Sequence, residues 1–300
     1  MAACRHHRGL LGLWLGFKIQ NRITNLPSMH EYDLGKHMNM NNTAIPQVLI
    51  TTLQQATHVV VFTGAGVSAE SGVPTFRDAQ TGLWERFDAE QLATIEAFLN
   101  DKELVWGWYE WRRMQVMRAQ PNPAHLSIAA LASLVPKLTV ITQNVDDLHE
   151  RAGSAQVLHL HGSLLSPRCF DCGQACTPPI AIPDEPAGGR RLSPPICLHC
   201  GGAVRPGVVW FGEELPVREL RRANASAKDC DLLFSIGTSS LVYPAAEIPN
   251  LAKQAGAKIV QIKKEKTPLD TDATWSFRGP AGVVLPDLLS AAYPEGGCAP

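Results

Sequence analysis

Five short runs of apolar residues recur along the chain, and each is rich in β-branched or aliphatic side chains. They lie at residues 58–63, 138–142, 157–160, 231–236 and 258–262. Continuous apolar runs of this length are typical of parallel strands that are buried on both faces of a sheet. The pattern therefore predicts five buried strands.

Segments with helical character separate these runs. We expect helices at residues 46–55, 101–118 and 245–255, the last as a crossover between two strands. Strands that alternate with helices predict an α/β fold with a doubly wound parallel sheet. Residues 164–207 are rich in Pro, Gly and Cys and lack helical periodicity, so we interpret them as an inserted module.

Composition limits the partners of this protein. The 300 residues carry a formal net charge of −1 and are 45% hydrophobic, which suits a globular chain of one large or two modest domains. The balanced charge gives no electrostatic footprint for nucleic acid. No apolar run approaches the roughly 20 residues that span a bilayer. We expect a monomer with no nucleic-acid or membrane partner.

The first 40 residues have a different composition, with basic side chains and no acid before Glu31. The basic residues are Arg5, Arg8, Lys18 and Arg22. Such segments can be transit peptides, which would indicate a mitochondrial protein. The alternative that we favour is a dispensable tail, or sequence ahead of a later start, and it predicts a cytoplasmic protein. The later start sites would be Met29, Met38 and Met40.

Two CxxC pairs indicate a metal site. They are formed by Cys169, Cys172, Cys197 and Cys200, with 24 residues between the pairs. Four thiolates complete a tetrahedral zinc shell and leave no position for water, so the site would be structural, with one zinc per chain. Cys176 is a possible competitor for Cys172, and we rank it as a bystander.

A glycine-rich turn follows the first apolar run. Gly64-Ala65-Gly66-Val67-Ser68-Ala69 has the spacing G-x-G-x-x-A, which is typical of a turn that holds a dinucleotide diphosphate. A plain tight turn between strand and helix is the alternative. The acid that usually ends the second strand of a dehydrogenase is not evident, because Asp78 comes too early. This argues against hydride transfer.

Polar residues also follow two later strands. Gln143, Asn144, Val145 and Asp146 come directly after the second apolar run, and His161 follows the third. Ligands bind at the carboxyl ends of parallel strands, where an amide and a carboxylate can orient a ribose or a carboxamide. A histidine there can act as a general base, although a structural role for His161 is equally open at this point.

Taken together, these motifs resemble the sirtuin family of NAD-dependent protein deacylases. GAGVSAESGVPTFRD, TQNVDDLHERAG, LHLHG, the CxxC pairs, VVWFGE and GTSSLVYPAA occur in that family's order, over roughly residues 46–290. The resemblance implies a Rossmann-like sheet with a smaller inserted zinc-ribbon and helical module. The catalytic domain would span 41–290, between a tail at 1–40 and another at 291–300. Its NAD-binding part would be about 46–75, 120–163 and 208–290, and its small module 76–119 and 164–207.

The resemblance also implies residue roles. His161 would be the proton acceptor, with Asn144 and Asp146 beside it in catalysis. NAD would contact Gly64, Ala65, Gly66, Ser68, Phe76, Arg77, Trp84, Gln143, Asn144, Val145, Asp146, Gly237, Thr238, Ser239, Lys263, Glu265 and Ala281. Val209, Trp210, Phe211 and Gly212 would line the acyl-lysine tunnel. Lys263 stands where the family usually has an Asn against the adenine ribose, which puts that hydrogen bond in doubt.

A Tyr-x-x-Arg pair refines the expected substrate. Tyr109 and Arg112 lie three residues apart, so they share one helix face and could bind one carboxylate. By sequence alone an aromatic packing face is the simpler interpretation. The pair is, however, similar to that of the sirtuin class, of bacterial or mitochondrial type, that removes succinyl, malonyl and glutaryl groups. Ala89 and Ala93 would leave room for the acyl group.

The implied reaction consumes NAD and acts on acylated lysines of proteins. The amide oxygen attacks C1′ of the nicotinamide ribose, and His161 then deprotonates a ribose hydroxyl that attacks the acyl carbon. The products would be free lysine, nicotinamide and O-acyl-ADP-ribose. A dehydrogenase, a non-enzymatic zinc-ribbon module and an ADP-ribosyl transferase are the alternatives. Release of nicotinamide without NADH formation would exclude the first.

Overall fold

The computed structural model describes residues 45–75, 88–177, 183–186 and 189–294. These residues belong to one compact unit of the chain, Ala44–Pro300. The tail at 1–40 and the expected cofactor-loop residues Phe76, Arg77 and Trp84 lie outside the described residues, and so does most of the tail at 291–300.

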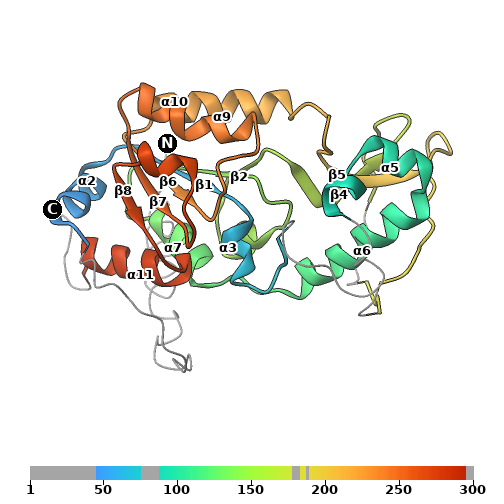
Figure 1. The fold of residues 1–300 in the computed structure, drawn as a ribbon, viewed down its shortest axis with the longest axis horizontal. Helices are drawn as coiled ribbons and strands as arrows, with labels where there is room; N and C mark the ends of the chain where they lie inside the picture. Colours follow the sequence, from blue (N-terminus) through green and yellow to red (C-terminus); the bar gives the residue numbers. More distant parts are fainter. Residues whose placement is uncertain (1–44, 76–87, 178–182, 187–188, 295–300) are drawn as a thin grey trace, which may run out of the picture. The chain divides into compact units, whose positions relative to one another are not determined.

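A parallel sheet forms the centre of this unit, and it confirms the predicted fold class (Figure 1). In the described part of the chain the strands run in the order β3-β2-β1-β6-β7-β8, and every neighbouring pair is parallel. The bounds are β1 Val59–Thr63, β2 Leu138–Thr142, β3 Val157–His159, β6 Leu232–Ile236, β7 Lys258–Ile262 and β8 Trp275–Phe277. The five predicted strands are confirmed, and β8 is an additional edge strand.

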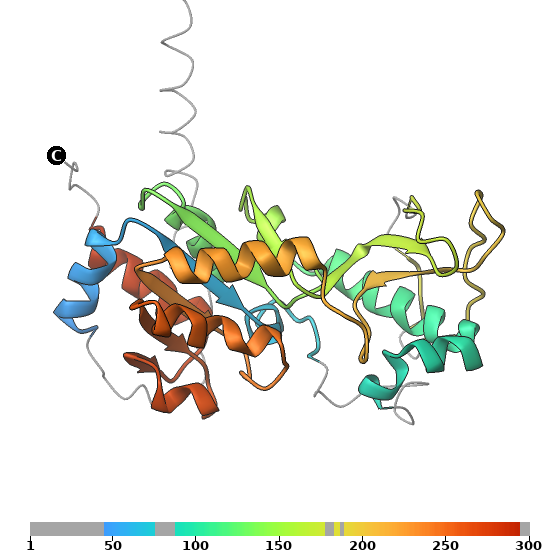
Figure 2. The same cartoon turned by 90° about the horizontal axis from the view of Figure 1, so that it is seen from above.

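Helices cover both faces of the sheet (Figures 1 and 2). On one face, Val59 and Val61 of β1 pack with α2 (Gln47–Gln55), α7 (Pro123–Leu131) and α11 (Ala281–Ala292). On the other face, Val60 and Phe62 pack with α9 (Val217–Asp229) and α10 (Ile248–Gln254). The alternation along β1 explains why its whole run is apolar.

Shorter helices complete the unit. They are α3 (Ala65–Ala69), α4 (Ala89–Leu92), α5 (Ile95–Asn100), α8 (Leu148–Arg151) and the 3-10 turns Ala245–Glu247 and Pro268–Thr271. Among the described residues, none of the helices combines the length and the apolar character needed to cross a membrane.

A smaller module lies beside the sheet. Its antiparallel strands β4 (Gly162–Cys169) and β5 (Val204–Val208) pack with the helix α6 (Lys102–Arg118) around a separate apolar core. Trp108 and Trp210 are among its fully buried side chains. Helix α6 begins where Asp101 accepts a hydrogen bond from the backbone of Leu104, as an N-cap does.

The strand order also fixes where a ligand can bind. β1 lies between β2 and β6, so the chain leaves β1 toward one side of the sheet and returns on its other side. The carboxyl ends of two such strands form a crevice that the connecting helices leave open. The turns at Gly64 and Gly237 follow these two strand ends.

Candidate active site

A cavity of about 300 Å³ lies at the carboxyl ends of the strands. Its walls include residues that follow five strands: Gly64 after β1, Gln143 after β2, His161 after β3, Gly237 after β6 and Lys263 after β7. Residues of the small module complete the walls. One cavity is therefore lined both by residues expected to contact NAD and by residues expected to contact the acyl-lysine. The lining residues expected from sequence are Gly64, Ala65, Gly66, Ser68, Ala93, Tyr109, Arg112, Gln143, Asn144, Val145, Asp146, His161, Val209, Trp210, Phe211, Gly212, Gly237, Thr238, Ser239 and Lys263.

Two backbone turns meet at one end of this cavity. The amide of Gly66 donates to the carbonyl of Gly237 over 2.8 Å. A Cβ on Gly66 would lie 2.7 Å from that oxygen, and one on Gly64 would lie 2.8 Å from Cα of Thr238. Gly237 has a φ of 63°, which favours glycine. Only glycines allow this approach, which places the turn before α3, the segment expected to bind a diphosphate, directly against the turn that follows β6.

Residues 143–146 form the loop beside these turns. Asn144 donates from Nδ2 to Ser68 Oγ over 2.9 Å, and its buried Oδ1 has no hydrogen-bond partner among the described residues. Gln143 donates from Nε2 to Thr238 Oγ1 over 2.8 Å. Burial raises the pKa of the Asp146 carboxyl, although the backbone amide of Leu148 and Ser68 oppose the shift. An orphaned buried amide oxygen at a cavity wall suits a ligand with hydroxyl or amide donors, such as NAD.

His161 is half-buried and holds one defined tautomer. Its Nδ1 lies 3.0 Å from the carbonyl oxygen of Gln143 and must donate to it, since a carbonyl only accepts. Nε2 is then unprotonated and can accept a proton at the cavity wall. Burial lowers the pKa of His161, while the bond to Gln143 opposes the shift. The imidazole is therefore neutral at physiological pH, as a general base requires.

Tyr109 and Arg112 of α6 line the same cavity, and both are buried. The phenol oxygen of Tyr109 accepts a hydrogen bond from Trp210 Nε1 over 3.0 Å. The guanidinium of Arg112 lies 5.2 Å from the ring centroid of Trp108 and donates to the carbonyl of Pro74 over 3.4 Å. The structure thus brings both residues of the Tyr-x-x-Arg pair to the cavity that holds His161.

Some residues expected at the site do not line the cavity. Ala89 is buried in the core of the small module, and Ala281 begins α11 and donates to Glu70 Oε1. Glu265 lies outside the wall and forms an ion pair of 2.7 Å with Lys263, which does line it. The roles of Ala89, Glu265 and Ala281 stay predictions.

The four predicted cysteines meet at one point of the small module. Their sulfur atoms all lie within 4.8 Å of one another. Cys169 and Cys200 are 3.4 Å apart, and Cys172 and Cys197 are 3.8 Å apart. Tetrahedral zinc with bonds of about 2.3 Å would place its sulfur ligands roughly 3.8 Å apart. The set therefore fits one structural zinc, and Cys176 is outside it.

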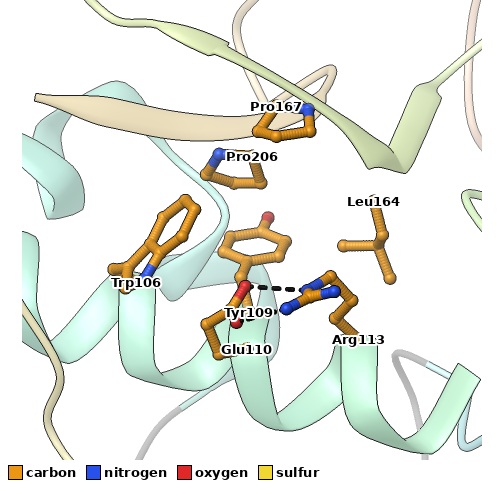
Figure 3. A pocket seen from close by; sticks show the side chains of 7 residues that line it. All are labelled: Trp106, Tyr109, Glu110, Arg113, Leu164, Pro167 and Pro206. Atoms are coloured by element: carbon orange, nitrogen blue, oxygen red, sulfur yellow. Dashed lines mark hydrogen bonds and ion pairs between the residues drawn. The ribbon is translucent and has the colours of Figure 1, made fainter. Parts of the chain in front are cut away.

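A second, much smaller cavity lies behind Tyr109. Its volume of about 10 Å³ holds roughly one water molecule. Figure 3 shows Glu110 and Arg113 of α6 paired with each other, and the ring of Tyr109 lies between this pair and Pro206 of β5. The pair is 2.8 Å apart and buried. This cavity is too small for a substrate, so it belongs to the packing that supports α6.

Several residues at or beside the site lie within the recognised motifs, but the sequence analysis gave them no role. Glu213 accepts hydrogen bonds from the buried Arg205 and from the backbone of Trp210, so it fixes the wall beside Tyr109. His159 and Glu150 contact the loop at Asn144. The only available signal was their place within VVWFGE, LHLHG and DDLHERAG.

Several known proteins are similar to this chain over most of its length. The family model described as the Sir2 family matches residues 64–244. The NAD-dependent protein deacylase of Methylococcus capsulatus is 60% identical over 243 residues, which cover 81% of this chain and 95% of that protein. NAD-dependent protein deacylase 1 of Pseudomonas aeruginosa is 56% identical over 250 residues, or 83% and 99%. A solved complex of a Sir2 homologue with NAD is similar at a TM-score of 0.77 and 45% identity, over 83% of this chain and 94% of that one.

Proposed function

The chain belongs to the Sir2 family of NAD-dependent protein deacylases, and from this premise we propose that it removes acidic acyl groups from protein lysines. The deacylase activity with NAD as co-substrate follows from the family. The proposal concerns the acyl group: succinyl and malonyl, with glutaryl as a longer candidate. The observation that carries it is that Tyr109 and Arg112 line the same cavity as His161.

Tyr109 supports the proposal through its proton. Burial raises the pKa of the phenol far above its ordinary value of 10.0, against a smaller opposing effect of Arg112. Because the oxygen already accepts from Trp210, its own O–H is left to donate. A protonated phenol at the cavity wall can donate a hydrogen bond to a carboxylate. The methyl group of an acetyl substrate cannot accept one.

Arg112 supplies the charge for the same contact. Arg112 is 6% exposed and lines the cavity, so a carboxylate bound beside it would be removed from bulk water. A guanidinium can donate two parallel hydrogen bonds to a carboxylate, which fixes orientation as well as affinity. Ala93 at the same wall leaves room for the extra length of a dicarboxylic acyl chain.

The geometry of the cavity also supports the remaining proposed roles. When bound, NAD would supply the ribose hydroxyl that receives the acyl group. One water is consumed, and the products are free lysine, nicotinamide and O-acyl-ADP-ribose. His161 Nε2 takes the proton of that hydroxyl, while Nδ1 stays on the carbonyl of Gln143. Asn144 and Asp146 orient the co-substrate from the loop beside it.

The test is the Arg112→Met variant, assayed for kcat/KM on succinyl and acetyl versions of one peptide. A hydrogen bond to a charged group contributes roughly 1.5–3 kcal/mol. Desuccinylation should therefore fall about 10–100-fold, at roughly 1.4 kcal/mol per factor of ten. Deacetylation should change little or improve, because acetyl-lysine has no carboxylate.

Arg118→Met is the matched control, since it removes an exposed guanidinium from the last turn of the same helix. It should leave the ratio of the two activities as in the wild type. If Arg112→Met lowers both activities equally, Arg112 supports the fold or NAD binding, and the proposed acyl preference is wrong.

A further inference from the structure

The three consecutive backbone carbonyl groups of residues 143–145 each accept a hydrogen bond from a donor within residues 159–164. Gln143 O accepts from His161 Nδ1 over 3.0 Å, and Asn144 O accepts from His159 Nδ1 over 3.1 Å. Val145 O accepts from the backbone amide of Leu164 over 2.9 Å. Two histidines, at alternate positions, thus make the same kind of contact with neighbouring residues of the loop.

The two imidazoles differ at their other nitrogen. His161 Nε2 is at the cavity, whereas His159 Nε2 lies 2.7 Å from the Glu150 carboxylate of α8 and is not part of the cavity wall. His159 is the last residue of β3 and is mostly buried. Its ring therefore connects an acidic side chain on one side to the loop on the other, without contacting substrate.

Proton counting defines the state of this ring. A carbonyl oxygen and an ionised carboxylate are both acceptors only, so both ring nitrogens of His159 must donate, and the ring must be an imidazolium. A neutral ring can satisfy only one of the two partners. Attraction to Glu150 would keep the proton on Nε2, so Asn144 O would lose its donor.

We propose that His159 and Glu150 form a positioning pair, in which the imidazolium of His159 holds Asn144 in its active position. The pair acts through Asn144 and makes deacylation depend on a protonated histidine as well as on the unprotonated His161. The proposal rests on the family's deacylase activity and is independent of the acyl preference.

The groups around His159 agree with this assignment. Burial lowers the pKa of His159, but the hydrogen bond and charge of Glu150, the carbonyl of Asn144 and the charge of Asp146 outweigh it, so the pKa is raised overall. Next to Glu150 on α8, His149 is buried, and burial lowers its pKa to about 3, so it adds no positive charge near neutrality. Helix α9 also packs against β3, but the described residues give it no ion pair or hydrogen bond to His159.

A two-sided pH profile follows. On acidification His161 gains a proton and stops acting as a base, so activity falls. On alkalinisation His159 loses its proton and releases Asn144 O, so activity falls again. The alkaline side of the profile is therefore set by a residue that does not contact substrate.

The experiment measures kcat/KM against pH for wild type, Glu150→Gln, His159→Asn and Glu96→Gln, using whichever acyl peptide the wild type turns over best. Glu150→Gln replaces the carboxylate by an amide that can donate to Nε2, so a neutral His159 keeps its proton on Nδ1 for Asn144 O, and the alkaline limb should flatten. His159→Asn has an amide that can replace Nδ1 as a donor at every pH, so this limb should flatten. Above that limb, the wild type should lose about 3–10-fold in kcat/KM, which corresponds to one net hydrogen bond.

Glu96→Gln removes an exposed carboxylate on α5 and should reproduce the wild-type profile. A proton NMR titration of the wild type should also show a histidine that titrates above its ordinary range and moves downward in Glu150→Gln. The proposal is overturned if Glu150→Gln and His159→Asn keep the wild-type alkaline limb. A wild type that prefers acetyl peptides would contradict the proposed acyl preference only.

Discussion

At the scale of single residues, the proposed chemistry depends on which nitrogen of His161 carries the proton. The carbonyl of Gln143 holds it on Nδ1, which leaves Nε2 as the proposed base. His161→Ala should fold and bind NAD but lose about 10²–10⁴-fold in deacylation, the usual contribution of a general base. Turnover by mass spectrometry and NAD binding by calorimetry check this, and near-normal turnover would contradict it.

Two further histidines are buried behind the site. Burial lowers the pKa of His125 to about 4 and of His149 to about 3, and their rings lie 4.9 Å apart. His149 Nε2 lies 2.9 Å from Thr63 Oγ1, which itself donates to Thr142 Oγ1, so the neutral ring donates to Thr63. Both residues are therefore neutral in the folded protein.

This burial predicts acid sensitivity. In the unfolded chain these histidines take up protons below about pH 6.5, but the folded protein excludes the protons until about pH 3–4. Each should therefore lower the free energy of unfolding by up to about 1.4 kcal/mol per pH unit below 6.5. Urea unfolding from pH 7.5 to 5.0 measures the slope. It should be shallower in His149→Gln, and equal slopes would contradict the prediction.

At the scale of elements, the approach of the β1–α3 turn to the β6 end predicts a sensitive position. In Gly66→Ala the new methyl group would lie 2.7 Å from Gly237 O, so one turn must move. Overpacking of this kind costs typically about 1–3 kcal/mol. The variant should unfold more easily and bind NAD more weakly, as measured by urea titration and calorimetry.

Gly279→Ala is the matched control, because its new methyl group would meet only Val284 Cγ2, at 3.4 Å. It should be close to the wild type in both measurements. If Gly66→Ala binds NAD as tightly as the wild type does, the prediction is wrong, and the close approach of the two turns does not shape the NAD-binding part of the cavity.

Elements differ in how well sequence predicts them. β1, β2, β6 and β7 are buried on both faces, so their apolar runs are continuous and easy to recognise. α9 was not predicted, because its fully buried residues are Ala223 and Ala227, which give little apolar signal among arginines. α11 was missed because Pro286 interrupts it, and β8 because three residues are too few for a period.

The residues of the candidate site also differ in how well sequence predicts them. Motifs located the residues that meet at the cavity, since strand ends carry them and strand order brings the ends together. Side-chain contacts for which no motif gives the partners could not be predicted in this way. Arg205 stacks 3.4 Å from the ring centroid of Trp210 and pairs with Glu213, and His159 pairs with Glu150, but nothing in their spacing indicates either contact.

At the scale of the whole molecule, the zinc site supports a helix that it does not touch. The segment that precedes Cys197 binds the start of α6: the amide of Leu192 donates to Glu103 O, and Ser193 Oγ donates to Glu103 Oε1. Closing the metal shell restrains this segment. Loss of zinc should therefore loosen the small module, including the helix that carries Tyr109 and Arg112.

Cys197→Ser should lose the metal and aggregate, whereas Cys176→Ser should keep about one zinc per chain, because Cys176 is outside the cluster. Elemental analysis and light scattering measure the two effects. Purified wild-type protein without zinc, or a Cys197→Ser variant with a full complement, would contradict the structural role.

Helix α6 has a consequence for how such enzymes diversify. The proposed base follows β3 and the co-substrate residues follow β1, β2 and β6, whereas the two residues proposed to select the acyl group both lie on one helix of the small module. If the proposed roles hold, substitutions within a single turn of α6 would change which modification is erased while the reaction centre stays the same. Substrate choice and catalysis could then be altered by mutation independently of each other.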